Sequence, residues 1–335
     1  MIVARAPLRL PLGGGGTDLP AYYTRYGGHW LSAGINRHMY IVLHGRSIEP
    51  AIKLKYSKIE ETNSVDKIEH GIFRSALKRY GIKDHLELTS IADVGAGTGL
   101  GSSGSFTVAL LAALHAYQSK ECSPSSLAEE AFEIEMSDLN LPVGKQDQYA
   151  AAFGGIRSYT AGKDGKIEAK DLGLDGETVL GLESNLLLFF TNYTRSSIQV
   201  LDQQGKKIAA NQDKAADAMH QIKEIGKRTQ NALERGDIDQ LGPLLDEHWK
   251  LKRGISDKMS NDSIDKWYSL ALKNGATGGK IVGAGGGGFF MFYCPSGPKN
   301  QEKLRSALAN AGLSEMRYKF DFSGATTLLN LEGDE

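Results

Sequence analysis

The sequence predicts an α+β protein built from two domains. The chain has 335 residues, about twice the length of a common single domain. Its first half mixes short strands with helices. From residue 185 onward the expected order is strand, helices, strand, strand, helix, strand, which is the order of a ferredoxin-like unit. We therefore expect an N-terminal domain over residues 1–180 and a C-terminal domain over residues 181–335.

Composition excludes several classes of function. The 39 Lys and Arg residues against 40 Asp and Glu residues give a net charge of −1, which argues against nucleic acid or an anionic membrane as a partner. Only Cys122 and Cys294 are present, too few for a disulfide scaffold or a Cys-rich zinc site. The longest apolar stretch, 106–117, is shorter than a membrane span, and Arg5 and Arg9 interrupt any signal peptide. The sequence predicts a cytoplasmic protein.

Hydrophobic spacing and capping residues predict the elements of the first half. A buried strand is expected at 39–43, and a half-buried strand is expected around Leu86 and Leu88. Apolar residues at helical spacing predict a helix over 63–80, which Gly81 would end in a left-handed conformation. Two more helices are expected, over 102–117 and from Ser123, as N-cap, to about Ser137.

The second half follows a hairpin turn expected at 162–165 and contains longer helices. A buried strand is expected at 185–191, and two strands are expected on either side of residues 283–288. The remaining expected elements are helices over 196–235, 237–252, 261–274 and 299–311, the last ending at Gly312, and strands near 316–322 and 325–331.

The strongest functional signal is the run GAGTGLGSSGS at residues 95–105, which leads into the apolar segment 106–117. Small residues let the backbone approach a ligand and adopt positive φ. The first N–H groups of the following helix are unpaired and lie at the positive end of its dipole. A turn whose serine only caps the helix is the alternative. The concentration of glycine and serine beside a buried helix favours a site for nucleotide phosphates.

The C-terminal glycine cluster, KIVGAGGGG at residues 280–288, satisfies the pattern G-x-G-x-x-G. A dinucleotide-binding loop must open a helix, whereas this one leads into the strand-like run 289–293, so a nicotinamide enzyme is disfavoured. Asn274 and Ile281 occupy positions that a Walker A loop reserves for Gly and Ser/Thr, so a P-loop NTPase is disfavoured too.

The N-terminal cluster carries four consecutive glycines, residues 13–16, followed by Thr17 and Asp18. This arrangement predicts a backbone-lined recess with a carboxylate at its rim, where Asp18 is able to accept hydrogen bonds from two sugar hydroxyls. A turn or N-cap aspartate before Leu19 is the alternative.

In this order, the three clusters resemble those of the GHMP kinase superfamily of galactokinase, homoserine kinase, mevalonate kinase and phosphomevalonate kinase. Residues 97–105 resemble its phosphate loop and residues 280–288 its third motif; segments 27–32 and 143–148 are similar to galactokinase-like members. The segments 6–28 and 142–155 look most like the branch of D-glycero-D-manno-heptose 7-phosphate kinases and fucokinase domains. The resemblance implies an N-terminal α/β domain like domain 2 of ribosomal protein S5 and a C-terminal ferredoxin-like domain with extra helices.

The resemblance also implies roles for particular residues. Asp147 would be the general base, and Arg9 would orient it and steady developing negative charge. Ser103 and Glu135 would hold Mg²⁺. From the residues alone, each of these roles has an alternative. Asp147 could be an acidic residue favoured by the helix dipole in a first turn, Arg9 could belong to a structural ion pair, and Glu135 could lie on a solvated acidic helix face. The segment implied to bind ATP comprises Gly95, Gly97, Gly99, Leu100, Gly101, Ser102, Ser103 and Gly104.

Substrate contacts are implied for the N-terminal and C-terminal clusters. Galactokinases have a Glu-His pair where this chain has Gly15 and Gly16, which leaves room for a sugar bulkier than a hexose. An arginine is expected to bind a phosphate of the substrate, because its guanidinium suits bidentate contacts. Arg195 is the first candidate, and Arg37, Arg46 and Arg157 are the alternatives. The residues expected to bind the sugar phosphate are Gly14, Gly15, Gly16, Thr17, Asp18, Gly286, Gly287 and Arg195.

Taken together, the resemblance implies an ATP- and Mg²⁺-dependent sugar kinase. The expected reaction is phosphorylation of the anomeric C1 hydroxyl of D-glycero-D-manno-heptose 7-phosphate to the 1,7-bisphosphate, in the synthesis of nucleotide-activated heptose for surface polysaccharide. A fucose or galactose 1-kinase and a non-catalytic sugar or ATP sensor are the alternatives. Expected partners are ATP and a sugar phosphate, without nucleic acid or membrane, and the sequence makes no prediction of oligomeric state.

Overall fold

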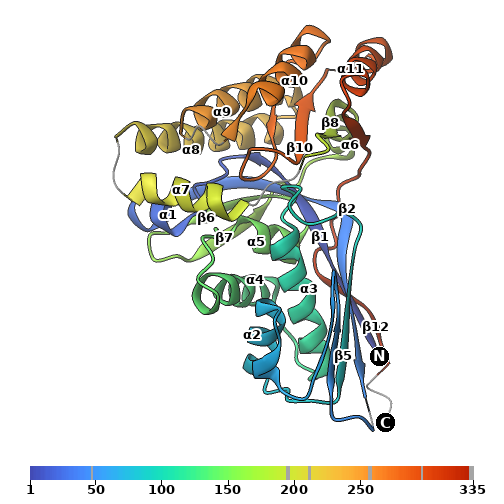
Figure 1. Cartoon of the computed structure of the whole chain (residues 1–335). Coiled ribbons are helices and arrows are strands. Elements are labelled where there is room, and N and C mark those ends of the chain that lie inside the picture. Colours follow the sequence, from blue (N-terminus) through green and yellow to red (C-terminus); the bar gives the residue numbers. More distant parts are fainter. Residues whose placement is uncertain (47, 194–196, 210–212, 256–258, 296, 332–335) are drawn as a thin grey trace.

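The computed structural model describes residues 1–46, 48–193, 197–209, 213–255, 259–295 and 297–331, which fold into two sheets covered by helices (Figure 1). The strands are β1 (Ile2–Gly13), β2 (Gly28–Gly45), β3 (Ile52–Lys55), β4 (Ile59–Thr62), β5 (Leu86–Ala92), β6 (Ile156–Ala161), β7 (Ile167–Asp171), β8 (Leu186–Phe190), β9 (Gly278–Ile281), β10 (Phe289–Tyr293), β11 (Ser314–Met316) and β12 (Thr326–Asn330). The α-helices are α1 (Pro20–Tyr26), α2 (Gly71–Arg79), α3 (Ser102–Tyr117), α4 (Pro124–Glu133), α5 (Gln146–Phe153), α6 (Gly176–Asn185), α7 (Ser197–Ala209), α8 (Asp213–Glu234), α9 (Leu241–Ile255), α10 (Asp262–Lys273) and α11 (Pro298–Asn310).

The larger sheet has eight strands, with the order β12-β1-β2-β5-β3-β4 and with β6 and β7 extending from β2. The long strand β2 pairs with β1 over most of its length, with β6 near its start and with β5 near its end. Helix α3 is apolar nearly all round and packs on β1 and β2, with α4 and α5 beside it (Figure 1). The start of α3 is therefore held against the central strands by burial of its side chains.

The smaller sheet has the order β11-β8-β10-β9, all antiparallel. With helices between β8 and β9 and helix α11 between β10 and β11, this is the split βαβ arrangement expected from the sequence. Phe290 and Phe292 of β10 pack against Trp249 of α9 in a buried aromatic cluster. The predicted α+β class, with a ferredoxin-like C-terminal unit, is confirmed.

The chain end returns to the first sheet, because β12 pairs antiparallel with β1. One apolar cluster also runs through both sheets, joining Ile2 of β1 to Leu188 of β8 and Met291 of β10. The division at residue 180 stays a prediction, and the two sheets are structurally continuous through this cluster and this strand.

Most predicted elements lie where expected, but two do not. The helix expected over 63–80 begins only at Gly71, after a single 3₁₀ turn, because a ring nitrogen of His70 accepts the amide of Phe73 and caps the helix there. The strand expected near 316–322 ends at Met316, and beyond it Phe320 makes only an isolated bridge to Ile35. Both errors are at boundaries, where caps and tertiary contacts override local periodicity.

The segment between β11 and β12 is fixed to the larger sheet by a buried hydrogen bond between His38 and Asp321. His38 Nε2 lies 2.8 Å from Asp321 Oδ2, and the other carboxylate oxygen accepts the amides of Ser323 and Gly324. Burial by itself would raise the pKa of Asp321, but these hydrogen bonds outweigh it and lower the pKa. A carboxyl with a lowered pKa stabilises the fold above its unfolded pKa, and this stabilisation is lost as the pH falls.

We expect Asp321→Ala to lower the free energy of unfolding at pH 7 by about 2–3 kcal/mol, because it leaves His38 and two amides without their acceptor. Urea unfolding at pH 7 and pH 4 measures this, and the loss should be smaller at pH 4. Asp217→Ala, at an exposed position of α8, is the control and should change stability by less than about 0.5 kcal/mol. An equal effect of both substitutions would contradict the assignment.

Candidate active site

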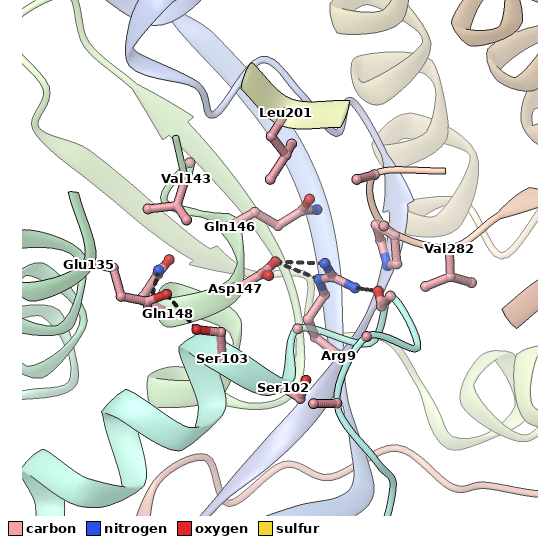
Figure 2. A pocket seen from close by; sticks show the side chains of 18 of the residues that line it. Arg9, Ser102, Ser103, Glu135, Val143, Gln146, Asp147, Gln148, Leu201 and Val282 are labelled. Atoms are coloured by element: carbon pink, nitrogen blue, oxygen red, sulfur yellow. Dashed lines mark hydrogen bonds and ion pairs between the residues drawn. The ribbon is translucent and has the colours of Figure 1, made fainter. Parts of the chain in front are cut away.

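The three glycine-rich segments meet around a cavity of about 610 Å³ between the two sheets (Figure 2). Its volume falls in the range of sites for small ligands. Backbone and side chains from both halves of the chain line it. The polar and glycine positions of the lining include Arg9, Gly15, Gly16, Asp18, Gly97, Gly99, Gly101, Ser102, Ser103, Glu135, Gln146, Asp147, Gln148, Gln204, Lys252, Lys280, Gly283, Gly285 and Gly287.

The segment before α3 forms a loop whose amides face no protein acceptor. Gly97, Gly99 and Gly101 all have positive φ, which glycine adopts without strain. Within the described chain, the amides of residues 97–103 donate no hydrogen bond to protein, and the first amide that does so belongs to Ser105. The loop therefore presents free N–H groups at the positive end of the α3 dipole, as an anion site requires.

Close backbone contact locks this loop to the C-terminal glycine cluster. A Cβ on Gly99 would lie 2.4 Å from the carbonyl oxygen of Val282, and a Cβ on Gly283 would lie 2.6 Å from the carbonyl oxygen of Gly99. The amide of Phe289 also donates to Thr98 O at 3.2 Å. The turn between β9 and β10 thus buttresses the anion loop, as expected for a turn at which another backbone approaches.

Arg9 of β1 and Asp147 of α5 form an ion pair beside the loop (Figure 2). Arg9 Nε and Nη2 contact Asp147 Oδ1 at 2.8 and 2.7 Å, and Nη1 donates to Gly99 O at 2.5 Å. A Cβ on Gly104 would lie 2.7 Å from Asp147 Cβ, so glycine there lets α3 and α5 approach. No residue of the described chain donates to Asp147 Oδ2, and the side chain is one-third exposed toward the cavity.

Glu135 is buried at 1% exposure and accepts three hydrogen bonds: from Ser103 Oγ at 2.8 Å, Gln148 Nε2 at 3.0 Å and Thr107 Oγ1 at 3.1 Å. It lies in a π-helical turn, Ile134–Asp138, that continues α4. Burial raises the pKa of Glu135, the nearby charge of Asp147 adds to this, and the hydrogen bonds oppose it. The carboxylate is thus held beside the anion loop at an electrostatic cost that a cation would remove.

Asp18, which follows the first glycine cluster, also lines the cavity. Its carboxylate accepts the amides of Gly16 at 2.8 Å and Gln146 at 3.1 Å. Burial raises its pKa, the charge of Asp147 raises it further, and the two amides oppose the shift. The predicted carboxylate at the rim of the first glycine cluster is therefore present, and it is positioned by backbone donors from two segments.

Several of the predicted site residues do not line the cavity. Leu100 is fully buried in the core, and the hydroxyl of Thr17 is bonded to the carbonyl oxygens of Gly14 and His29, so neither lines the cavity. Other positions outside the lining are Gly14, Gly95, Gly104 and Gly286. Arg195 lies outside the described residues.

Several lining residues were missed by sequence reasoning. Lys252 of α9 and Lys280 of β9 are buried in the cavity wall, and Gln204 of α7 is 2% exposed. From the sequence, Lys252 lies in a segment with the pattern of an ordinary amphipathic helix, and Lys280 lies just before a glycine-rich turn. A charged residue inside a short apolar strand was the one available signal for Lys280.

The far end of the cavity is aromatic. Tyr56, His70 and Phe106 line it together with Met39. His70 packs against both Tyr56 and Phe106, with ring centroids 4.8 and 5.2 Å apart. An apolar pocket beyond an anion loop has the size and polarity to take a nucleotide base.

Comparison with known families assigns the class of protein. The GHMP kinases N terminal domain matches residues 67–155, and the GHMP kinases C terminal domain matches residues 230–313. The chain belongs to the GHMP kinase family and is an ATP-dependent kinase.

Particular relatives extend over the whole chain. It is 33% identical to the D-glycero-alpha-D-manno-heptose 7-phosphate kinase of Campylobacter jejuni, over 96% of each chain. The structure of a D-glycero-D-manno-heptose 1-phosphate kinase from Bacteroides thetaiotaomicron superposes with a TM-score of 0.81 at 28% identity, covering 98% of this chain and 99% of that one. Galactokinase of Lactococcus lactis, at 19% identity and a TM-score of 0.78 over 98% of this chain and 95% of that one, shares the fold.

Two features are absent from the described part of the chain. None of its helices combines the length and apolar character that crossing a membrane requires. Among the same residues, no three His, Cys, Asp or Glu side chains gather closely enough to hold a metal by themselves.

We expect Gly99→Ala to lower the free energy of unfolding by more than about 1 kcal/mol and to weaken ATP binding at least about tenfold. Residue 99 has a positive φ, which alanine disfavours, and the added methyl group would collide with Val282 O. Urea unfolding and calorimetric titration with ATP measure the two effects. Gly176→Ala, where a Cβ meets no atom within 4 Å, is the matched control and should leave both unchanged. Normal ATP affinity in Gly99→Ala would remove this contact from the site.

Proposed function

We propose that the enzyme phosphorylates the anomeric C1 hydroxyl of D-glycero-D-manno-heptose 7-phosphate to the 1,7-bisphosphate, using ATP. The observation that carries the proposal is the Arg9–Asp147 pair beside a loop of unpaired amides, in a chain 33% identical to a heptose 7-phosphate kinase. A role in making nucleotide-activated heptose for surface polysaccharide, in the cytoplasm, follows from that substrate.

ATP would occupy the cavity with its phosphates on the amides of the loop before α3. Gly97, Gly99, Gly101, Ser102 and Ser103 line the cavity along this loop. The purine would reach the aromatic end, and the γ-phosphate would point toward Asp147. Helix N-termini and glycine loops bind phosphates in this way without any charged side chain.

Asp147 would act as the general base. Arg9 occupies its Oδ1, so the unpaired Oδ2 is available for the proton of the C1 hydroxyl. As that proton moves to Asp147, the hydroxyl oxygen forms a bond to the γ-phosphorus, the bond to the β–γ bridging oxygen breaks, and ADP leaves. Because Arg9 is also fixed to Gly99 O, it holds the base in register with the phosphate loop.

The residues around Glu135 fit the expected Mg²⁺. The side-chain oxygen of Gln148 is buried beside Glu135 and has no hydrogen-bond partner in the described chain, so a hard oxygen ligand is left over there. Glu135, Ser103 and the Gln148 oxygen would hold the ion together with phosphate oxygens. When bound, Mg²⁺ supplies charge neutralisation to the β- and γ-phosphates.

The sugar would lie between Asp18 and Asp147. Asp18 is placed to accept sugar hydroxyls, and Gly15, Gly16 and Gly287 form the neighbouring walls. A Cβ on Gly16 would lie 2.7 Å from Gln204 Nε2, so this polar group of α7 already fills the position of the absent side chain and forms part of the wall. This polar wall suits an acceptor that carries more hydroxyls than a hexose.

A panel of acceptors tests the substrate. We expect kcat/KM for D-glycero-D-manno-heptose 7-phosphate to exceed that for fucose, galactose and unphosphorylated heptose by at least about 10²-fold, because a missing phosphate leaves the arginine expected to bind it without its partner. A coupled assay of ADP release measures this. Heptose 1-phosphate belongs in the panel, since one structural relative is named for it. A higher kcat/KM for fucose, galactose or heptose 1-phosphate would overturn the assignment.

Asp147→Asn should lower kcat at least about 10²-fold while ATP still binds, because the amide keeps the shape of the side chain and cannot take the proton. Single-turnover phosphoryl transfer and calorimetric ATP binding measure the two quantities. Asp164→Asn, on the exposed β6–β7 turn, provides a control for the chemical change. Near-normal turnover in Asp147→Asn would exclude it as the base.

A further inference from the structure

Two lysines form part of the cavity wall on the side of the smaller sheet. Lys252 of α9 is 7% exposed and Lys280 of β9 is 2% exposed, and both line the cavity. They come from elements that pack directly against each other. Two lysine side chains are therefore buried in the same wall of the cavity, close enough for Lys252 to act electrostatically on Lys280.

Few protein groups offset the cost of burying these two lysine side chains. Lys252 Nζ donates to Gly283 O at 2.5 Å, and the side-chain nitrogen of Lys280 makes no hydrogen bond or ion pair with any residue that the structure describes. No carboxylate of the cavity forms an ion pair with either lysine: Asp147 pairs with Arg9, Glu135 accepts neutral donors, and Asp18 accepts two backbone amides. A buried cation without an anionic partner is unfavourable, so such a pair indicates a bound anion.

Neighbouring positive charges make a protonated state of these two lysines still less favourable. Burial lowers the pKa of Lys252 to about 8; the charge of Arg9 also lowers it, and Asp18 opposes the shift. The pKa of Lys280 is lowered by burial, by Lys252 and by Arg9. His248, one turn before Lys252, is fully buried with both ring nitrogens unpartnered; burial and the two lysines lower its pKa, so it adds no charge near pH 7.

The location of the pair points to the reacting end of the cavity. Gly283, which accepts from Lys252, touches Gly99 of the anion loop, and Arg9 donates to the same Gly99. Asp18, at the sugar end, acts electrostatically on Lys252. The two lysines thus lie between the proposed donor and acceptor positions.

We propose that Lys252 and Lys280 contact the phosphoryl group during its transfer and neutralise its charge from the side of the smaller sheet. This inference rests on the proposed kinase function. The γ-phosphorus moves from the bridging oxygen of ATP to the C1 oxygen, ADP leaves, and Asp147 takes the hydroxyl proton; the lysines keep their protons throughout. Preplaced cations aimed at developing charge act mainly on the transition state.

The test compares Lys280→Met and Lys252→Met with the wild-type enzyme. For Lys280→Met we expect kcat to fall at least about 10²-fold, with a KM for the acceptor within about threefold of wild type. The melting temperature of the ligand-free protein should rise, because methionine replaces a buried unpaired charge at similar volume. Stabilisation by inorganic tripolyphosphate should weaken. Lys266→Met, on the exposed side of α10, is the control and should change none of these.

The outcomes separate this inference from the proposed function. Normal kcat together with a lower melting temperature in both variants would show a structural role and overturn the proposal. An increase of KM for the phosphorylated sugar at unchanged kcat would assign the lysines to the acceptor's own phosphate and also overturn it. If the wild-type enzyme phosphorylates no heptose phosphate, the proposed substrate fails. In that case, the melting temperature and the tripolyphosphate response still test the lysines, and either unchanged value overturns the inference.

Discussion

The guanidinium of Arg9 is the interaction on which the site depends. Through one side chain it joins β1, the carboxylate of Asp147 and the carbonyl of Gly99. These three points belong to a central strand, the first turn of α5 and the loop before α3. Because two guanidinium nitrogens converge on one oxygen of Asp147 while the third donates to Gly99, Arg9 fixes the position of the proposed base relative to the phosphate loop. Glycine at position 104 makes the arrangement possible by letting the two helices approach.

The cavity is built from charges whose burial would be costly in isolation. Asp18 and Glu135 have raised pKa values because they are buried, and Lys252 and Lys280 have lowered ones for the same reason. Glu135 lies beside Ser103 of the anion loop, whereas Lys252 and Lys280 belong to the wall on the side of the smaller sheet, where Asp18 acts electrostatically on Lys252. A magnesium–nucleotide complex carries both signs of charge and would relieve both sets. Electrostatic preorganisation of this kind is stored in the fold before the substrate arrives.

The comparisons and the geometry of the site agree that the protein is an ATP-dependent kinase, but the relatives do not agree on the sugar. The relatives named for heptose phosphates differ in the carbon that carries the phosphate. In this chain the proposed acceptor side of the cavity is lined by Asp18, Gly15, Gly16, Gly287 and Gln204. These are neutral or acidic groups suited to hydroxyls, so the position of the cationic groups decides how a phosphorylated sugar is oriented.

The sequence by itself determined the parts that depend on local physics: the glycine loop that opens α3, Asp147 in the first turn of α5, and the turn between β9 and β10. Periodicity and helix-terminus chemistry act within a few residues, so they were readable. Only the tertiary structure decided which of these residues face one cavity. Pairing of β12 with β1, the unpartnered oxygen of Gln148 and the two buried lysines depend on segments far apart in sequence. Burial and charge balance are properties of that packing, and no local pattern encodes them.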